Sequence, residues 1–417
     1  MSNPLRRYPP ELWLLFFGRV ITATGYSFSF PFFAIYCAGH LKIPMGDVGA
    51  AFAMSGFAGM IARFCGGELA DRLGRKIVMQ GALAGRALTS AGIAWQIATG
   101  APFWHLAATF VASNFAGQIF EPSSQAYVAD ISTGRMRAES FGFVRMGINA
   151  GWALGMILNA IVTESYVVTF AITAGVFALS LLLFSVFLRE PPRAPHPDEP
   201  GPPLSAIFAN RPFLLLAGAA VLLSVVWSQL VAGTSMYASG FACIPDKTIA
   251  WILAVNGTGV FLLQIPATRW MGRIGLVPAL VTGCLLYGAG YGSYTFCTQP
   301  WHFALAIAVV TCGEVLCAPA GASLATELAP LSQRGRYLGA YMLTQNSGQV
   351  FGPYISGQLL QRFPTHPGAT WFTIAGIAGA SAIAHLAIVK LYGVGKRPPA
   401  EVESDAKPMA VAAEKEA

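Results

Sequence analysis

Two carboxyl groups lie within long apolar segments, where an ionisable side chain is costly and is a functional candidate by default. One is Glu314, in the segment Gly313-Glu314-Val315-Leu316-Cys317-Ala318-Pro319, which contains no cation. A carboxyl group that leaves water without a charged partner binds a proton more readily. Glu314 is therefore predicted to take up and release protons as its exposure alternates. The alternative is a permanently protonated acid that only forms hydrogen bonds.

The second acid, Glu121, is predicted to lie in one layer with three bases. At 1.5 Å per residue, Arg19, Arg86, Glu121 and Arg145 each lie roughly 10–14 Å from one end of a predicted helix. This layer could contact substrate or take part in coupling, which makes Glu121 a second candidate proton site. In the alternative interpretation Glu121 is a structural ion-pair partner, and one or two of the arginines extend to the membrane surface.

Further polar and aromatic side chains within apolar segments form a candidate substrate cavity. Four polar residues between positions 114 and 125 follow the spacing i, i+4, i+7, i+11, which places them on one face of a helix. The predicted cavity residues are Arg19, Tyr26, Asn114, Gln118, Gln125, Arg145, Asn149, Trp152, Gln345 and Asn346.

The composition indicates the elements that position these residues. Hydrophobic residues make up 55% of the chain and charged residues 11%, whereas a soluble domain carries about a quarter charged residues. A polytopic membrane protein is therefore expected. The net charge of +7 would suggest a nucleic-acid partner in a soluble protein, but most cations here fall between apolar segments on one predicted side. This bias predicts a multi-pass protein of the cell (inner or plasma) membrane with both termini in the cytoplasm, and no nucleic-acid partner.

Twelve apolar segments are long enough to cross a bilayer as helices. The predicted spans are residues 12–36, 46–66, 77–99, 102–130, 137–161, 165–188, 212–238, 247–267, 276–297, 301–327, 335–360 and 368–392. The predicted fold is an all-α membrane protein with two pseudo-symmetric six-helix bundles, residues 1–188 and 212–394. A Pro-rich cytoplasmic linker, 189–211, joins the bundles, and a charged tail, 395–417, is expected to be disordered.

An internal repeat supports this division into halves. Ile43-Pro44 recurs at Ile244-Pro245, and Asn149 recurs at Asn346, with other matches at nearly the same spacing. Duplicated six-helix halves are a transporter architecture in which the binding site lies between the halves, near the middle of the membrane.

One short stretch between the second and third spans is both charged and ordered. Residues 67–76 read Gly-Glu-Leu-Ala-Asp-Arg-Leu-Gly-Arg-Lys, and five charges predict a tight turn at the membrane surface. The stretch resembles the loop between helices 2 and 3 of the major facilitator superfamily, Gly-x-Leu-x-Asp-Arg-x-Gly-Arg-Lys, and fills every fixed position. The resemblance implies a conformational latch in which the loop acid faces the start of helix 11 and the second Arg pairs with an acid at the foot of helix 4. The latch residues are Gly67, Asp71, Arg72, Gly74, Arg75 and Asp130, of which Arg72, like Lys76, is expected to face solvent or headgroups.

The segment around Glu314 carries a second resemblance. A Gly-Glu pair followed by a Pro is similar to helix 10 of twelve-helix drug:proton antiporters, which implies that Glu314 carries protons. The Gly-Pro element of antiporter helix 5 is absent, since Met156 follows Gly155, and the pair occurs instead at Gly352-Pro353.

These observations predict a secondary active transporter that works by alternating access and exports small amphipathic organic compounds against protons. The alternative is an organic-anion or metabolite carrier that uses the arginine layer. A membrane enzyme is not favoured, because the sequence has no nucleotide-binding loop and no metal-ligand pair within a helix. The expected partners are a small-molecule substrate, protons and the lipid bilayer, with no cofactor or metal, and the protein is expected to be a monomer.

Overall fold

The computed structural model describes residues 8–132, 134–162, 165–191, 207, 209–330 and 333–393. Most of the predicted linker and all of the predicted tail lie outside this range. The first half comprises α1 (Pro10–Ile35) with its short continuation η2 (Tyr36–His40), α2 (Met45–Leu73), α3 (Arg75–Ala98), α4 (Phe103–Ile131), α5 (Gly134–Val162) and α6 (Tyr166–Phe187). The second half comprises α8 (Arg211–Trp227), η3 (Ser228–Leu230), α9 (Ala232–Gly240), α10 (Asp246–Ile274), α11 (Leu276–Ser293), η4 (Tyr294–Phe296), α12 (Pro300–Glu327), α13 (Arg334–Arg362) and α14 (Gly368–Tyr392).

Each predicted span coincides with a helix, but two details of the prediction are wrong. The span predicted at 212–238 is broken into α8, η3 and α9. The tight turn predicted at 67–76 is mostly helix, since α2 continues to Leu73 and only Gly74, at φ +106°, interrupts the helical run before α3. Glu68 and Arg72, four residues apart, form an acid–base pair that stabilises this end of α2, and Asp71 with Arg75 joins it to the start of α3.

Nine of the described helices are long and apolar enough to cross a membrane; α3, α4 and α13 are not among them. These three have 24, 29 and 29 residues, so length does not exclude them. They are less apolar because they carry many of the polar side chains that face the protein interior. The predicted all-α fold with twelve long helical segments is confirmed.

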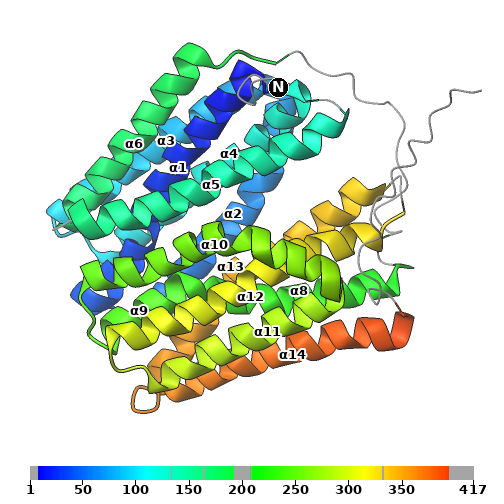
Figure 1. Cartoon of the computed structure of the whole chain (residues 1–417). Coiled ribbons are helices and arrows are strands. Elements are labelled where there is room, and N and C mark those ends of the chain that lie inside the picture. The colour runs from blue at the N-terminus through cyan, green and yellow to red at the C-terminus, as the bar shows by residue number, and fades with distance from the viewer. Residues whose placement is uncertain are drawn as a thin grey trace, which may run out of the picture.

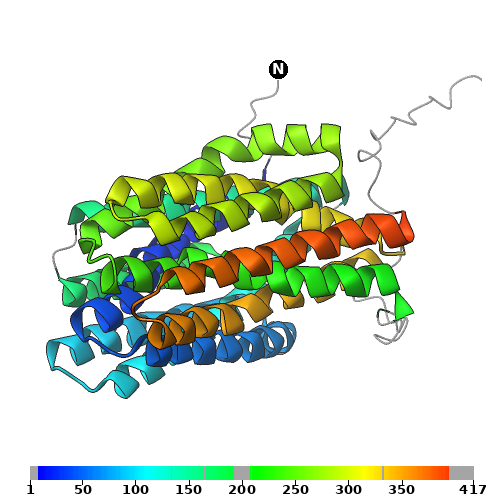
Figure 2. The same cartoon turned by 90° about the horizontal axis from the view of Figure 1, so that it is seen from below.

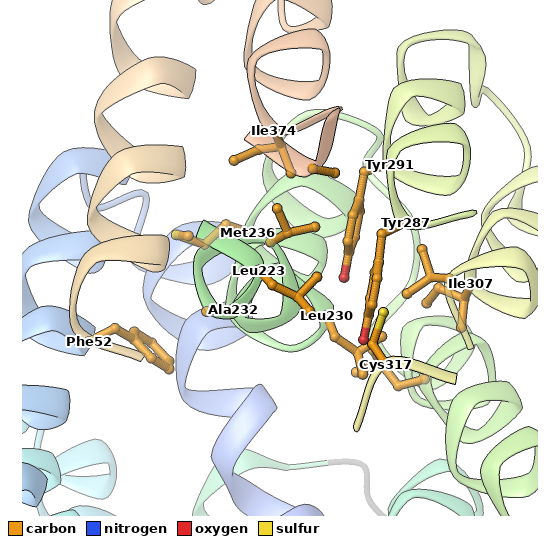
Figure 3. Close-up of a cluster of buried hydrophobic side chains, with 14 of the residues drawn as sticks. Phe52, Leu223, Leu230, Ala232, Met236, Tyr287, Tyr291, Ile307, Cys317 and Ile374 are labelled. Atoms are coloured by element: carbon orange, nitrogen blue, oxygen red, sulfur yellow. The ribbon is translucent and has the colours of Figure 1, made fainter. Parts of the chain in front are cut away.

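Within each half, the helices pack against one another. In the first half α1 packs on α5, α2 on α4, and α3 on α4 and α6; in the second half α11 packs on α12 and α14. The helices α8 and α14 lie side by side (Figure 2). Tyr287 and Tyr291 of α11 stack in the apolar core of the second half, with ring centroids 6.3 Å apart (Figure 3).

The halves meet along α2 with α13 and α5 with α10. We call the end of the molecule that carries the start of α1 and the end of α14 the terminal face, and the opposite end, with η2 and the α9–α10 connection, the distal face. The two bundles converge at the distal face and diverge toward the terminal face (Figure 1). At the distal face the amide of Gly46 donates to Gln361 Oε1 at 2.8 Å, which joins the start of α2 to the end of α13. The structure is therefore closed at the distal face.

Small residues allow the closest helix contacts. A Cβ atom at Gly151 of α5 would lie 2.3 Å from the carbonyl oxygen of Val20 in α1, and one at Gly348 of α13 would lie 2.0 Å from the backbone of Ser224 in α8. Glycine stripes in these helices permit such backbone approach in membranes.

We expect Gly151→Ala to destabilise the first bundle by about 1–3 kcal/mol, the usual range for overpacking, because the clash is with backbone that cannot rotate away. Thermal unfolding of the purified protein in detergent measures the effect. Gly175→Ala in α6 is the control, since a Cβ there meets nothing within 4 Å. Equal melting temperatures for the two variants would contradict the packing argument.

Candidate functional site

Glu314 of α12 is held by two neutral donors from neighbouring helices. Trp227 Nε1 of α8 donates to one carboxylate oxygen at 3.1 Å, and Asn256 Nδ2 of α10 donates to the other at 2.7 Å. Asn256 also bonds Thr311 Oγ1 at 3.0 Å. Within the described part of the chain Glu314 forms no ion pair, in line with the expectation that it lacks a charged partner, but it has two neutral hydrogen-bond donors that were not predicted. No feature of the sequence indicates these donors, which lie about 60–90 positions away on other helices.

Asn256 connects this carboxyl group to the space between the two halves. A narrow cavity of about 10 Å³ lies there, and its lining is apolar apart from the Asn256 amide. The lining residues come from α5, from the α8–α9 break and from α10: Trp152, Met156, Leu230, Val231, Leu253, Asn256 and Gly257. A change in the packing of α5 against α10 would therefore alter the surroundings of Asn256 and, through it, of Glu314.

Glu121 is an ion-pair partner. Its carboxylate accepts from Arg19 Nη2 at 2.6 Å and from Gln125 Nε2 at 3.1 Å. Of the three bases in the predicted layer, only Arg19 contacts Glu121. Arg86 lies instead over the rings of Tyr26 and Phe177, and Arg145 is exposed. The geometry favours the structural alternative for Glu121 over a proton carrier.

A second arginine, Arg63 of α2, joins the two halves. It donates through Nε to Gln118 Oε1 at 2.7 Å and through Nη1 to Asn346 Oδ1 at 2.5 Å, so it links α2, α4 and α13. Asn114, one turn before Gln118, donates to the carbonyl of Ser55 at 2.9 Å. Arg63 was not among the predicted cavity residues, although it is an ionisable residue in an apolar segment and that signal was sufficient to select it.

The predicted cavity residues are thus brought together only in part. Arg19 and Gln125 meet at Glu121, Gln118 and Asn346 meet at Arg63, and Tyr26 stacks edge-on against Trp152 with ring centroids 5.6 Å apart. Asn114 accepts from Gln118 Nε2 at 3.5 Å. The other three, Arg145, Asn149 and Gln345, contact none of these groups through a hydrogen bond that the structure shows.

The charged end of α2 forms a compact cluster at the terminal face. Arg75 bonds Asp71, and its Nε donates to Asp130 Oδ2 at 3.1 Å, the pairing that the family resemblance implies. Glu190, which was not predicted, accepts the backbone N–H groups of Arg75 and Lys76 and so caps the start of α3.

Two of the latch expectations are not met in this conformation. Asp71 bonds Arg75 and its side chain is 54% exposed, whereas the prediction places it against the start of helix 11, which is α13. Arg72 is exposed beside Glu68, but Lys76 donates to the carbonyl of Ser185 at 3.0 Å instead of facing only solvent. A Cβ at Gly67 would meet nothing within 4 Å, so the surface beside this glycine is open. Since the halves diverge at the terminal face, α13 is not available to Asp71.

A model of the major facilitator superfamily matches residues 15–243 and 241–415, which is nearly the whole chain. The chain belongs to the major facilitator superfamily. It is therefore a membrane transporter and not an enzyme.

Its relatives carry several different names. A Na⁺, Li⁺, K⁺/H⁺ antiporter of Planococcus maritimus is 25% identical over 408 residues, with 90% of this chain and 95% of the relative covered. An uncharacterized MFS-type transporter of Mycobacterium tuberculosis is 30% identical over 298 residues, covering 69% and 68%. The multidrug resistance protein MdtH of Aeromonas hydrophila is 24% identical over 380 residues, covering 89% and 93%.

Solved structures agree on the fold. The nucleoside transporter NupG superposes with a TM-score of 0.75 at 15% identity and covers 92% of this chain and 100% of its own. A POT family transporter in complex with 5-aminolevulinic acid also reaches a TM-score of 0.75 at 15% identity and covers 92% and 97%. At these identities the likeness supports the architecture and does not indicate a substrate.

Proposed function

We propose that this transporter exports small amphipathic organic compounds from the cell in exchange for protons, by alternating access between two rocking bundles. The observation that carries the proposal is Glu314, whose carboxylate accepts from the neutral donors Trp227 and Asn256 and forms no ion pair with any described residue. One of these donors, Asn256, lines the apolar space between the halves. A carboxyl group without a cationic partner can gain or lose a proton when its exposure changes. Relatives named as a cation/proton antiporter and a multidrug resistance protein support this assignment.

The orientation belongs to the same proposal. Lys and Arg accumulate in cytoplasmic segments, and the charged end of α2 lies at the terminal face. We assign the terminal face to the cytoplasm of a cell membrane, with both termini there. The structure, closed at the distal face, then corresponds to the state that opens inward.

Reconstituted liposomes test the proposal. With the purified protein in the membrane, a pH step should drive movement of a fluorescent lipophilic cation in the direction opposite to the protons, and dissipating the step with a protonophore should stop it. Movement of the dye that is the same with and without the pH step would refute proton coupling. No movement of several amphipathic dyes, with protons still exchanged, would refute the substrate class.

A second candidate function is exchange of alkali cations for protons. The relative named as a Na⁺, Li⁺, K⁺/H⁺ antiporter covers 90% of this chain. Glu314, with a neutral amide beside it, could exchange protons either for organic compounds or for alkali cations. The same liposomes loaded with Na⁺ or K⁺ and no dye distinguish the two. The organic-anion alternative has less support, because Arg19 is neutralised by Glu121 and Arg63 is occupied by two amides.

A polar contact between the halves at the distal face should influence the opening of that face. Asp246 at the start of α10 is bonded by His40 Nε2 of η2 at 3.0 Å and by the hydroxyl of Tyr166 at the start of α6. The ring of Tyr36 packs beside both. Both donors belong to the first half and the acceptor to the second, so the contact must break when the distal face opens.

We expect Asp246→Asn to shift the conformational equilibrium toward an open distal face by about three- to tenfold. Hydrogen bonds to a charged group contribute roughly 1.5–3 kcal/mol, but the His40 and Asp246 side chains are 55% and 33% exposed, which lowers the effect below this range, to about 0.7–1.4 kcal/mol. Spin-label distances across the distal face measure the shift. The control is Asp47→Asn, in the first turn of α2, because the structure shows no ion pair from Asp47 to the second half. If both variants keep the wild-type distance distribution, this contact does not hold the face closed.

A further inference from the structure

The guanidinium of Arg86 lies inside the first bundle, in a cavity whose lining residues all belong to that bundle. Its central carbon is 4.8 Å from the ring centroid of Tyr26 and 4.3 Å from that of Phe177. It also lies against Gly117 of α4, where a Cβ atom would come within 2.8 Å of Arg86 Nη1. The glycine makes room for a cation at this position, so the site is built around the guanidinium.

Arg86 differs from the other interior arginines in having no anionic or hydrogen-bonding partner. Arg19 is paired with Glu121, and Arg63 donates to two amide oxygens. Arg86 forms neither an ion pair nor a hydrogen bond with any residue in the described ranges, and its Nε is buried without a partner. Two aromatic faces offset part of the cost of burying the charge. An isolated buried cation costs considerably more than these two contacts offset, so a counter-ion is needed.

A cavity of about 20 Å³ adjoins the guanidinium, enough for one water molecule or one small ion and too small for an organic substrate. None of the residues that line it is acidic. Ser90 in α3 and Ser113 in α4 also line it; both residues are buried, and neither hydroxyl forms a hydrogen bond that the structure shows with another described residue. By contrast, the hydroxyl of Ser29, which also lines the cavity, already donates to the carbonyl of Gly25 at 3.3 Å.

We propose that this cavity binds one small inorganic anion, of the size and charge of chloride, as the counter-ion of Arg86. One guanidinium and two free hydroxyls supply donors to an anion, and the lining offers no carboxylate that a metal cation would require. The bound ion ties α3 to α4 and neutralises the only interior arginine of the described first bundle that lacks a polar partner. The site is separate from Glu314, so it does not depend on which substrate is exported.

The test compares thermal unfolding of the purified protein in sodium chloride and in sodium gluconate at equal ionic strength. A ligand that binds only the folded state raises the melting temperature as its concentration passes its dissociation constant. We expect a saturable rise of several degrees in chloride and none in gluconate, and one radiolabelled chloride bound per chain. Equal melting curves in the two salts, with no bound chloride, would overturn the proposal and leave water as the occupant.

Variants locate the site. Arg86→Met, which keeps the apolar length of the side chain, should abolish the chloride response, and the double variant Ser90→Ala with Ser113→Ala should weaken it at least tenfold in apparent affinity while Arg86 remains. Ser29→Ala is the matched control and should respond as the wild type does, since its hydroxyl is engaged elsewhere. If Arg86→Met does not fold, the serine double variant decides the outcome. A full chloride response in either of the two cavity variants would place the anion elsewhere and refute the assignment.

Discussion

Glu314→Gln is expected to abolish transport driven by a pH step, with at least a tenfold loss of rate, while the protein still folds and binds substrate. Glutamine keeps an oxygen that can accept from Asn256 or Trp227, so the hydrogen bonds that hold the side chain are largely preserved. It cannot bind or release a proton in the accessible pH range. The loss should therefore appear in coupled transport and be absent from the melting temperature.

Two further measurements make this result specific. Substrate exchange between equal pools, which needs no proton gradient, should persist in the Glu314→Gln variant. Glu327→Gln is the control, because this acid lies on the same helix, is exposed near the terminal face and forms no ion pair that the structure shows. Coupled transport at the wild-type rate in Glu314→Gln would show that another group carries the proton and would remove the main support for antiport.

Most of the long helices could be predicted from the sequence because they are apolar runs long enough to cross a bilayer, and such a run has few alternatives to a helix. The break between α8 and α9 was missed, since Ser228 and Gln229 interrupt neither the apolar character nor the length of the run. The helical end of α2 was also missed, because five charges in ten residues suggest a loop unless their spacing of four is used.

The site was predictable only where a single residue is unusual for its segment. Glu314 was selected because an acid in an apolar run is rare. Its donors, Trp227 and Asn256, are ordinary membrane-helix residues, and the packing angles of α8 and α10 against α12 alone bring them there. Depth along a helix says nothing about rotation, so the predicted layer could not show that Arg19 faces Glu121 whereas Arg86 does not.

The contrast between the two acids follows from the same geometry. Glu121 shares its site with a guanidinium at 2.6 Å, which favours the charged form in every conformation that keeps α1 against α4. Glu314 has donors on two other helices of the second half, one of which, Asn256, lines the boundary with the first half. A rocking motion of the two halves would change the surroundings of Glu314 and leave those of Glu121 nearly unaltered. This difference is why the coupling proposal rests on Glu314 alone.

Asp71→Asn is expected to reduce transport to less than a tenth of the wild-type rate without removing the protein from the membrane. In the present conformation the Asp71 side chain is 54% exposed, and Arg75, which Asp130 also holds, is its one partner among the described residues. Its loss should therefore cost the fold well under 1 kcal/mol. Its larger role is expected in the other conformation. When the terminal face closes, the start of α13 can approach the open surface beside Gly67, and the positive end of that helix attracts an anion.

In the Asp71→Asn variant the neutral amide would weaken that attraction, so the conformation with a closed terminal face would be poorly populated. The transport cycle would then stall with the terminal face open. Transport assays in liposomes, together with spin-label distances across the terminal face, measure both consequences. Glu68→Gln is the matched control, because Glu68 is an acid on the same helix end, is exposed and pairs with Arg72 one turn along. A variant that transports normally while Asp71 is uncharged would show that α13 closes without this carboxylate, and the charged end of α2 would then serve only to fix the orientation of the chain in the membrane.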